Sequence, residues 1–454
     1  MGHREMYRRG MGCRGMGANK PIWTALLVLA FFLDGTLPAQ STGQTIRHHK
    51  VAEQDSSFPP GLTQAESAIE KGDDASAEPL LKKVVAADPN NFQAWFDLGF
   101  VYNRLGNTQE SIAAYRKSVA AKPDVFESNL NLGLMLAKAG QPDAEQFLRA
   151  ATTLKPTANV DEGHARAWLS LAHVVENTKP DAAIEAYKQA AALEPKNPEP
   201  YLSAGLLLEK ENRFADAEGQ YKQVLAIDPA SADALTAMTN IYLREQRFVD
   251  AEQILDKMIA MHPDDLSARL QLGRTLLILE KYDEAIADLQ IARKLDPGNS
   301  LVQHDLGDLY LQSKKYDQAE ALYRALVAAH PNDAELHHSL GVAFLKQLKY
   351  ADAQQEFLTA VKLKPDFGEA YGDLAVAAVE NKNYELAIKA ANARAKFLPE
   401  IPVSYFLRAS AYDHLRDYKM AAQNYHRFLE VANGAYPDQE WQARHRLIAI
   451  EPKK

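Results

Sequence analysis

Proline recurs through most of this chain at a fixed interval, and that interval limits the fold more than any other feature. Seven prolines are evenly spaced, at about 34 residues, in the part of the chain from Pro195 to Pro399. Pro89, Pro123 and Pro156 extend the series towards the N-terminus at nearly the same interval. A fixed period of roughly 20–50 residues is typical of solenoids, in which each unit packs only against its neighbours. We therefore expect a repeat protein rather than a set of separate globular domains.

Each interval carries the apolar pattern of two helices. Between Pro297 and Pro331, Leu306 and Tyr310 lie on one helical face, and Tyr323 lies on a second face after a polar break. Proline lacks an amide hydrogen and ends the second helix, and the Asn and Asp residues that follow the prolines are expected to cap the next one. The repeat is therefore predicted to be a pair of helices joined by a tight turn.

These repeated residues resemble the tetratricopeptide repeat, whose pattern is W-x2-L-G-x2-Y, then A-x3-F, then P. The fullest copy contains Trp95, Leu98, Gly99 and Tyr102, and it ends at Pro123. The resemblance implies an all-α, right-handed superhelix (an α-solenoid) of about eleven helix-turn-helix repeats. Glycine in the middle of a helix costs roughly 1 kcal/mol against alanine, so its recurrence predicts close approach of the two helices there.

The resemblance divides the chain into four parts. The repeats cover about residues 58–434, and residues 435–454 form an amphipathic helix around Trp441 that is expected to cap the stack. Residues 1–39 are expected to be a signal peptide, or alternatively a membrane anchor, and residues 40–57 a flexible linker.

One junction between repeats is longer than the others. The distance along the chain from Pro156 to Trp168 is twice the distance from Pro89 to Trp95. The extra segment Asn159–His164 is expected to be a tolerated loop insertion. A contact loop at the edge of a binding groove is the alternative.

The N-terminal segment has the composition of an export signal. A basic region ends at Lys20, and the apolar run Ile22–Leu33 follows it. As a helix this run would span about 18 Å, which is short for a hydrocarbon core of about 30 Å. Cleavage after Ala39 would give an exported, periplasmic or secreted protein of the bacterial type, and an uncleaved inner-membrane anchor is the alternative. Whether translation starts at Met1 or Met16 stays open.

Composition and motifs exclude several classes of function. A net charge of −9 disfavours nucleic acid or an anionic membrane as the main partner, so a membrane contact is expected only if the N-terminal segment is uncleaved. Cys13 is the only cysteine and would be removed with the signal.

No catalytic motif is present, so we expect neither an enzyme nor a cofactor. His304, Asp308 and His338 were weighed as metal ligands, but their loose spacing favours ordinary histidines.

Members of the resembled family commonly hold a peptide or a partner helix in a groove lined by the first helices, and the same is expected here. The apolar members of the expected site would bury side chains of the partner, while amide and guanidinium groups would hold its backbone or a carboxylate. Core packing of the apolar residues, and solvation or intrachain pairing of the arginines, are the alternatives. The expected site consists of Phe96, Phe100, Asn131, Leu134, Asn240, Arg244, Gln271 and Arg274.

Two specialised functions of the resembled family are disfavoured. The Lys and Asn set that grips a terminal carboxylate pair is missing, because Phe96 and Phe100 occupy two of its positions. The asparagine ladder of repeat-bearing glycosyltransferases is missing as well. The expected function is a non-catalytic adaptor that binds a protein segment, within a cell-envelope or secretion assembly. A membrane-anchored structural subunit and a polysaccharide-binding accessory module are the alternatives.

Overall fold

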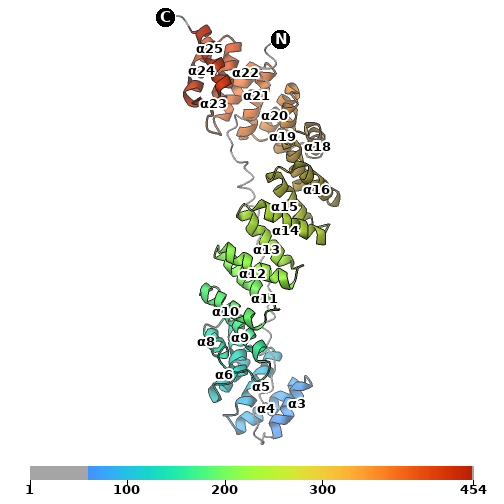
Figure 1. The fold of residues 1–454 in the computed structure, drawn as a ribbon, viewed down its shortest axis with the longest axis vertical. Helices are drawn as coiled ribbons and strands as arrows, with labels where there is room; N and C mark the ends of the chain where they lie inside the picture. The colour runs from blue at the N-terminus through green and yellow to red at the C-terminus, as the bar shows by residue number, and fades with distance from the viewer. Residues whose placement is uncertain (1–59, 452–454) are drawn as a thin grey trace. The chain divides into compact units, whose positions relative to one another are not determined.

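The computed structural model describes residues 60–451, which form two compact units, residues 60–261 and residues 262–451 (Figure 1). The described residues contain 23 helices and no strand, so the predicted all-α helical-repeat fold is confirmed. The predictions of a signal peptide or anchor at 1–39 and a linker at 40–57 lie outside the described residues.

The N-terminal unit consists of helix pairs packed one after another. We name the odd-numbered member of each pair the first helix and the even-numbered member the second helix. The helices are α3 (Pro60–Glu70), α4 (Asp74–Ala87), α5 (Phe92–Arg104), α6 (Thr108–Ala121), α7 (Phe126–Lys138), α8 (Ala144–Ala151), α9 (Val160–Val175), α10 (Pro180–Leu193), α11 (Glu199–Lys210), α12 (Phe214–Ile227), α13 (Ala232–Arg244) and α14 (Phe248–Met261).

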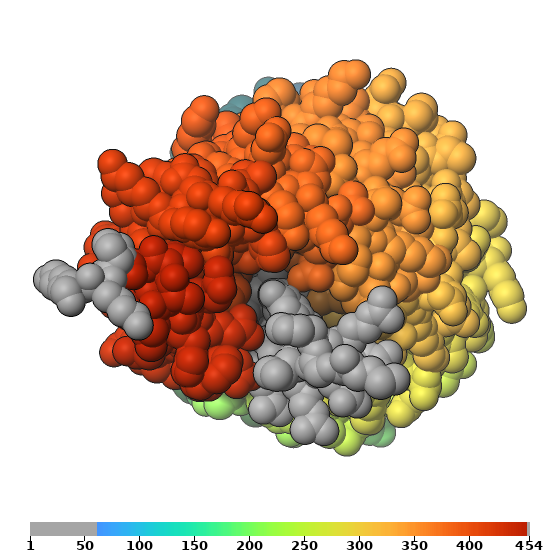
Figure 2. All heavy atoms as spheres, turned by 90° about the horizontal axis from the view of Figure 1, so that it is seen from above, coloured from blue at the N-terminus to red at the C-terminus, as the bar shows by residue number. Residues whose placement is uncertain are grey.

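The C-terminal unit repeats the same arrangement and ends with one additional helix, α25. Figure 2 looks onto this unit, and the red spheres of its last helices lie beside the orange spheres of the preceding ones. No described helix is both long enough and apolar enough to cross a membrane. The helices are α15 (Leu266–Ile278), α16 (Tyr282–Leu295), α17 (Ser300–Gln312), α18 (Tyr316–Ala329), α19 (Ala334–Lys346), α20 (Tyr350–Leu363), α21 (Gly368–Glu380), α22 (Tyr384–Arg394), α23 (Pro402–His414), α24 (Tyr418–Ala432) and α25 (Pro437–Ile450).

The turn inside most pairs contains one residue in the left-handed conformation. The amide after it donates to the carbonyl five residues back, as Arg247 N–H does to Tyr242 at 2.8 Å, which is the Schellman arrangement. This conformation costs a non-glycine residue about 1–2 kcal/mol, so hydrogen bonds and packing must hold it. Glycine takes the position in the first three repeats, and other residues take it from the fifth repeat onwards: Gly72, Gly106, Gly140, Asn212, Gln246, Glu280, Lys314, Leu348, Lys382 and Arg416.

In several repeats the turn between pairs is fastened by a side chain two residues after the proline. Asn91 accepts the amide of Ala94 at 2.9 Å, and Asp265 accepts the amide of Ala268 at 3.0 Å. Asp333 caps α19 in the same way, so the predicted helix caps are confirmed at these positions.

The proline carbonyl is itself bound by the side chain six residues later. Trp95 Nε1 donates to the carbonyl of Pro89 at 2.9 Å, and Arg269 Nε donates to that of Pro263 at 2.8 Å. These positions share an N–H donor rather than an aromatic ring, so the hydrogen bond is the feature they have in common. The same contact is made by Asn129 to Pro123, Gln303 to Pro297 and His337 to Pro331.

The mid-helix glycines lie against a large side chain of the second helix. A Cβ atom at Gly205 would lie 2.5 Å from Tyr221 Cε1, and one at Gly307 would lie 2.5 Å from Tyr323 Cζ. Such distances are too short for carbon atoms in contact, so the predicted close approach of the two helices is confirmed. The tyrosine rings therefore pass beneath the first helix, and their hydroxyl groups reach its far side.

The extra residues before Trp168 lengthen a helix instead of forming a loop. α9 begins at Val160 and has 16 residues, whereas α8 before it has only 8. The prediction of a loop insertion over Asn159–His164 is therefore wrong for all but its first residue. Asp161 and Glu162 lie in the first turn of α9, where carboxylates favour helix formation through the helix dipole.

The first helices line one side of each unit. Neighbouring first helices contact each other, as α11 and α13 do in the N-terminal unit and α19 and α21 do in the C-terminal unit. Among the described residues, the second helices of neighbouring pairs do not pack against one another as closely as the first helices do. The first helices therefore lie on the inner side of the curve of each unit, and we name this surface the inner face.

Candidate functional site

Four predicted groove residues lie in the interior of the N-terminal unit. Phe96, Phe100, Asn131 and Leu134 are all buried. The ring of Phe96 meets that of Tyr115 edge-on with centroids 5.7 Å apart, and Asn131 Nδ2 donates to the hydroxyl of Tyr115 at 3.4 Å. These contacts match the alternative of core packing, and partner binding at the four positions stays a prediction.

The other four predicted residues divide between the two units. On α13, Asn240 is half-buried and Arg244 keeps 43 % of its side chain exposed. On α15, Gln271 and Arg274 are half-buried, and Arg274 Nε donates to Asp305 Oδ2 at 2.7 Å. Burial raises the pKa of Asp305, and Arg274 opposes that rise. Arg274 is thus held in a hydrogen-bonded ion pair, whereas Arg244 is more exposed, makes only a longer contact of 3.8 Å to Glu209 and lies over the ring of Phe214.

Tyrosines of the second helices present their hydroxyl groups to carboxylates of the first helices. Tyr221 donates to Glu209 Oε2 at 3.2 Å after its ring has passed beneath Gly205. Burial raises the pKa of Glu209, while the Tyr221 hydroxyl and the charge of Arg244 oppose the rise. The same contact joins Tyr187 to Glu176, Tyr323 to Asp308 and Tyr425 to Asp413.

This tyrosine contact was not predicted from the sequence, although a signal for it exists. Tyr221 and Tyr323 follow the mid-helix glycines of their repeats, Gly205 and Gly307, at one and the same spacing. A tyrosine at that distance has its ring beneath the glycine, and its hydroxyl then needs an acceptor on the inner face.

Histidines of the C-terminal unit lie in separate pairs. His304 Nδ1 lies 3.4 Å from Asp308 Oδ2, and His338 Nε2 lies 2.8 Å from Asp373 Oδ2. Among residues 60–451, no group of three or more His, Cys, Asp or Glu side chains is placed to hold a metal ion. Each histidine thus has a carboxylate partner of its own, and the two do not converge on one site.

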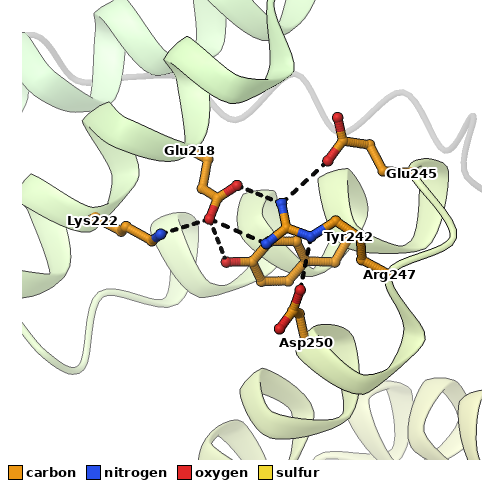
Figure 3. A network of polar contacts seen from close by, with 6 residues as sticks. All are labelled: Glu218, Lys222, Tyr242, Glu245, Arg247 and Asp250. Atoms are coloured by element: carbon orange, nitrogen blue, oxygen red, sulfur yellow. Dashed lines mark hydrogen bonds and ion pairs between the residues drawn. The ribbon is translucent and has the colours of Figure 1, made fainter.

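A cluster of charged side chains joins the fifth and sixth repeats of the N-terminal unit (Figure 3). Glu218 of α12 accepts from Arg247 at 2.6 Å, from Tyr242 at 3.0 Å and from Lys222 at 2.6 Å. Arg247 also binds Asp250 at 2.7 Å, and its guanidinium lies over the ring of Tyr242. Arg247, with Lys222 and Tyr242, lowers the pKa of Glu218 to about 2. The shifted pKa therefore reflects contacts between repeats rather than a catalytic arrangement.

Three family models match the chain. The model described as the cilia and flagella-associated protein 70 C-terminal domain matches residues 54–303, which is more than half of the 454 residues. The chain belongs to this tetratricopeptide-repeat family. Two further tetratricopeptide-repeat models match residues 276–341 and 338–403 of this repeat protein. The resemblance to the tetratricopeptide repeat is thus confirmed, and families of this type are typically non-catalytic.

Curated relatives share only short stretches with the chain. Protein O-mannosyl-transferase TMTC3 of Mus musculus is 22% identical over 164 residues, which cover 34% of this chain and 18% of that protein. The tetratricopeptide repeat and J domain-containing co-chaperone DNJ1 of Fusarium oxysporum f. sp. lycopersici is 30% identical over 83 residues, which cover 18% of this chain and 16% of that protein. The chain spans less than a fifth of the length of these two relatives.

Solved structures similar to this one are helical-repeat proteins. Yeast Tom70 is 15% identical, with 86% of this chain and 94% of that chain covered and a TM-score of 0.35. The hetero-tetramer Cut9-Hcn1 of the APC/C is 17% identical, with 85% and 96% covered and a TM-score of 0.38. No functional inference rests on these similarities.

Proposed function

We propose that the chain is a non-catalytic scaffold that binds a segment of a partner protein on the inner face of its N-terminal unit. Tetratricopeptide repeats generally bind protein or peptide partners. The observation that carries the proposal is Leu206 of α11, whose side chain is 48 % exposed on this face. Asn240 and Arg244 lie on the adjacent first helix α13. An apolar side chain beside an amide and a guanidinium group suits an extended or helical protein segment.

The assignment as non-catalytic is supported by the partners of the groups with shifted pKa values. Glu209 is bound by Tyr221, and Asp305 is bound by Arg274. Each of these contacts joins two helices, so burial and helix packing account for the shifts. A general acid or base would instead face an open cavity with room for a substrate.

We propose further that the protein acts after export, in a cell-envelope or secretion assembly. The basic region before Lys20, the apolar run Ile22–Leu33 and the small residue Ala39 support this proposal. The membrane enters as a partner only if that segment is retained as an anchor.

Site-specific photo-crosslinking tests binding at the inner face. A photoreactive amino acid at Asn240 is expected to capture a defined segment of a partner, which mass spectrometry of the crosslinked peptides identifies. The control places the same amino acid at Lys188, which is exposed on the second helix α10. Equal capture from both positions, or capture from Lys188 alone, would show that the inner face is not the binding surface.

A further inference from the structure

Exposed cations line one edge of the inner face in the N-terminal unit. The first helices α7, α11 and α13 carry Lys138, Lys210 and Arg244 in their last turns, whereas Arg104 at the end of α5 is paired with Asp74 at 2.8 Å. In the C-terminal unit, the first helices α15, α17 and α21 have no basic residue there, whereas α19 has Lys346 and α23 has His414. Asp and Glu outnumber Lys and Arg over residues 60–261, so the row does not reflect a generally basic surface.

Lys210 and Arg244 form a continuous part of this row. Lys210 Nζ donates to Asn177 Oδ1 at 3.0 Å, and Arg244 Nη1 lies 3.8 Å from Glu209 Oε1, which is beyond hydrogen-bond distance. Leu206 lies one helical turn before Lys210 on the same face of α11. An exposed apolar side chain therefore lies one turn from the exposed cation Lys210, and Arg244 lies on the adjacent first helix α13.

The carboxylates of the same face lie deeper than the cations. The side chain of Glu209 is 19 % exposed, against 43 % for Arg244. Glu209 and Glu176 each accept a tyrosine hydroxyl, from Tyr221 and Tyr187. The charges that a partner meets first are therefore those of Lys210 and Arg244.

We infer that the partner segment is acidic, with an apolar side chain that packs on Leu206 and carboxylates that reach Lys210 and Arg244. The inference rests on the proposed inner-face binding and names the chemistry of the partner. Charge complementarity decides for an acidic occupant, because exposed cations repel a basic segment and leave a neutral one without ionic contacts. Asn240 lies one helical turn before Arg244 on α13 and has both a donor and an acceptor for the backbone of the segment.

Fluorescence anisotropy with the full chain and synthetic peptides tests this inference. The probe is a short fluorescein-labelled peptide that alternates Glu and Ser around one central Leu. It is expected to bind on the order of tenfold or more tightly than the same peptide with Lys in place of Glu. Replacing its Leu by Ser is expected to weaken binding, and added salt is expected to weaken the acidic probe most.

Charge reversal on the protein provides the matched comparison. Lys210→Glu/Arg244→Glu is expected to bind the acidic probe more weakly, by on the order of tenfold or more. Lys117→Glu/Lys188→Glu makes the same change in net charge on the second helices α6 and α10 and is expected to keep the affinity. If Lys210→Glu/Arg244→Glu fails to fold, Lys210→Gln/Arg244→Gln takes its place in the affinity comparison. The helicity of this variant is checked by circular dichroism.

Two outcomes of the peptide-binding assay would overturn the acidic assignment without touching the proposed function. One is equal or tighter binding of the Lys peptide, and the other is equal loss of affinity in the two reversed proteins. Capture of a segment without carboxylates by the crosslinker at Asn240 would do the same. Failure of the proposed function has a different signature, because no inner-face crosslink would then form with any partner.

Discussion

Glu218→Gln is expected to loosen the contact between the fifth and sixth repeats of the N-terminal unit. The substitution keeps the shape of the side chain and an oxygen that accepts from Tyr242, but it removes the charge that faces Arg247 and Lys222 (Figure 3). The expected loss is therefore ionic and not a loss of packing.

The expected loss in the free energy of unfolding follows from the shifted pKa of the Glu218 carboxyl group. Contacts led by Arg247 lower the pKa of Glu218 from its ordinary 4.5 to about 2, which corresponds to at most about 3 kcal/mol in the free energy of unfolding. Arg247 and Lys222 keep 37 % and 59 % of their side chains exposed, so solvent screens part of this attraction. We therefore expect Glu218→Gln to cost about 1–2 kcal/mol at neutral pH.

The pH dependence has a definite sign. The folded pKa of Glu218 lies below its unfolded value, so its stabilisation is fully present above pH 4.5 and is lost as the pH falls towards about 2. The difference between wild type and Glu218→Gln should therefore shrink over this window, because both proteins then carry an uncharged side chain at this position.

Hydrogen exchange is the suitable assay, because a repeat array need not unfold in one step. The opening free energy of amides in α12–α14 is compared between wild type and variant at neutral pH and near pH 3. At each pH, the measured exchange rate is divided by the intrinsic rate of the unprotected amide at that pH. Glu110→Gln, at an exposed position on α6, is the control and is expected to stay within about 0.5 kcal/mol. A loss below about 0.5 kcal/mol at neutral pH, or an equal loss at both pH values, would refute the ionic explanation.

Leu348→Gly is expected to stabilise the protein by about 0.5–1 kcal/mol in thermal unfolding, because Leu348 is 56 % exposed at a φ of 62° that glycine adopts freely; a lower midpoint would contradict this. His337→Leu is expected to cost about 1–3 kcal/mol in the same assay, since a carboxylate and the proline carbonyl lose their donor. His337→Gln is expected to cost less, because Gln303 makes the equivalent carbonyl contact one repeat earlier; equal losses would count against that contact. N-terminal sequencing of the mature protein is expected to begin after Ala39, and retention of Trp23 would exclude cleavage.

The helix pairs follow from the sequence because their determinants repeat in every unit, but the left-handed turn does not. Gly72, Gly106 and Gly140 recur once per repeat at equal spacing and carry a visible signal for it. Leu348 and Arg416 adopt the same conformation further along the chain, and neither residue type favours it. The Schellman hydrogen bonds and the contacts of the packed helices impose the turn there, and these are properties of the folded repeat rather than of the local sequence.

The groove residues were predicted from their register, which gives the face of a helix but not the partners of a side chain. Arg244 and Arg274 lie on the same face of their helices and differ by one turn in register, yet only Arg274 is paired at hydrogen-bond distance. Its partner Asp305 lies 31 residues later, on the next first helix. His338 and Asp373 are paired over 35 residues in the same way. Opposite charges about one repeat apart are therefore candidates for pairing, but Arg244 and Glu209 have this spacing too and lie 3.8 Å apart, so the sequence alone does not give the strength of the pair.

The ion pair with Asp305 also indicates that Arg274 has a structural role rather than a role in partner binding. A partner carboxylate that took its guanidinium would leave Asp305, which is only 5 % exposed, as a buried charge without its cation. Arg274→Ala is therefore expected to lower the free energy of unfolding by about 1–3 kcal/mol, the loss being limited because Asp305 can take up a proton. Arg244→Ala removes only the longer contact to Glu209, which is less buried than Asp305 and keeps its hydrogen bond from Tyr221, and is expected to change stability by less than about 0.5 kcal/mol while weakening the acidic probe. Equal effects of the two substitutions on stability would show that exposure and pairing do not separate binding from structural arginines in this protein.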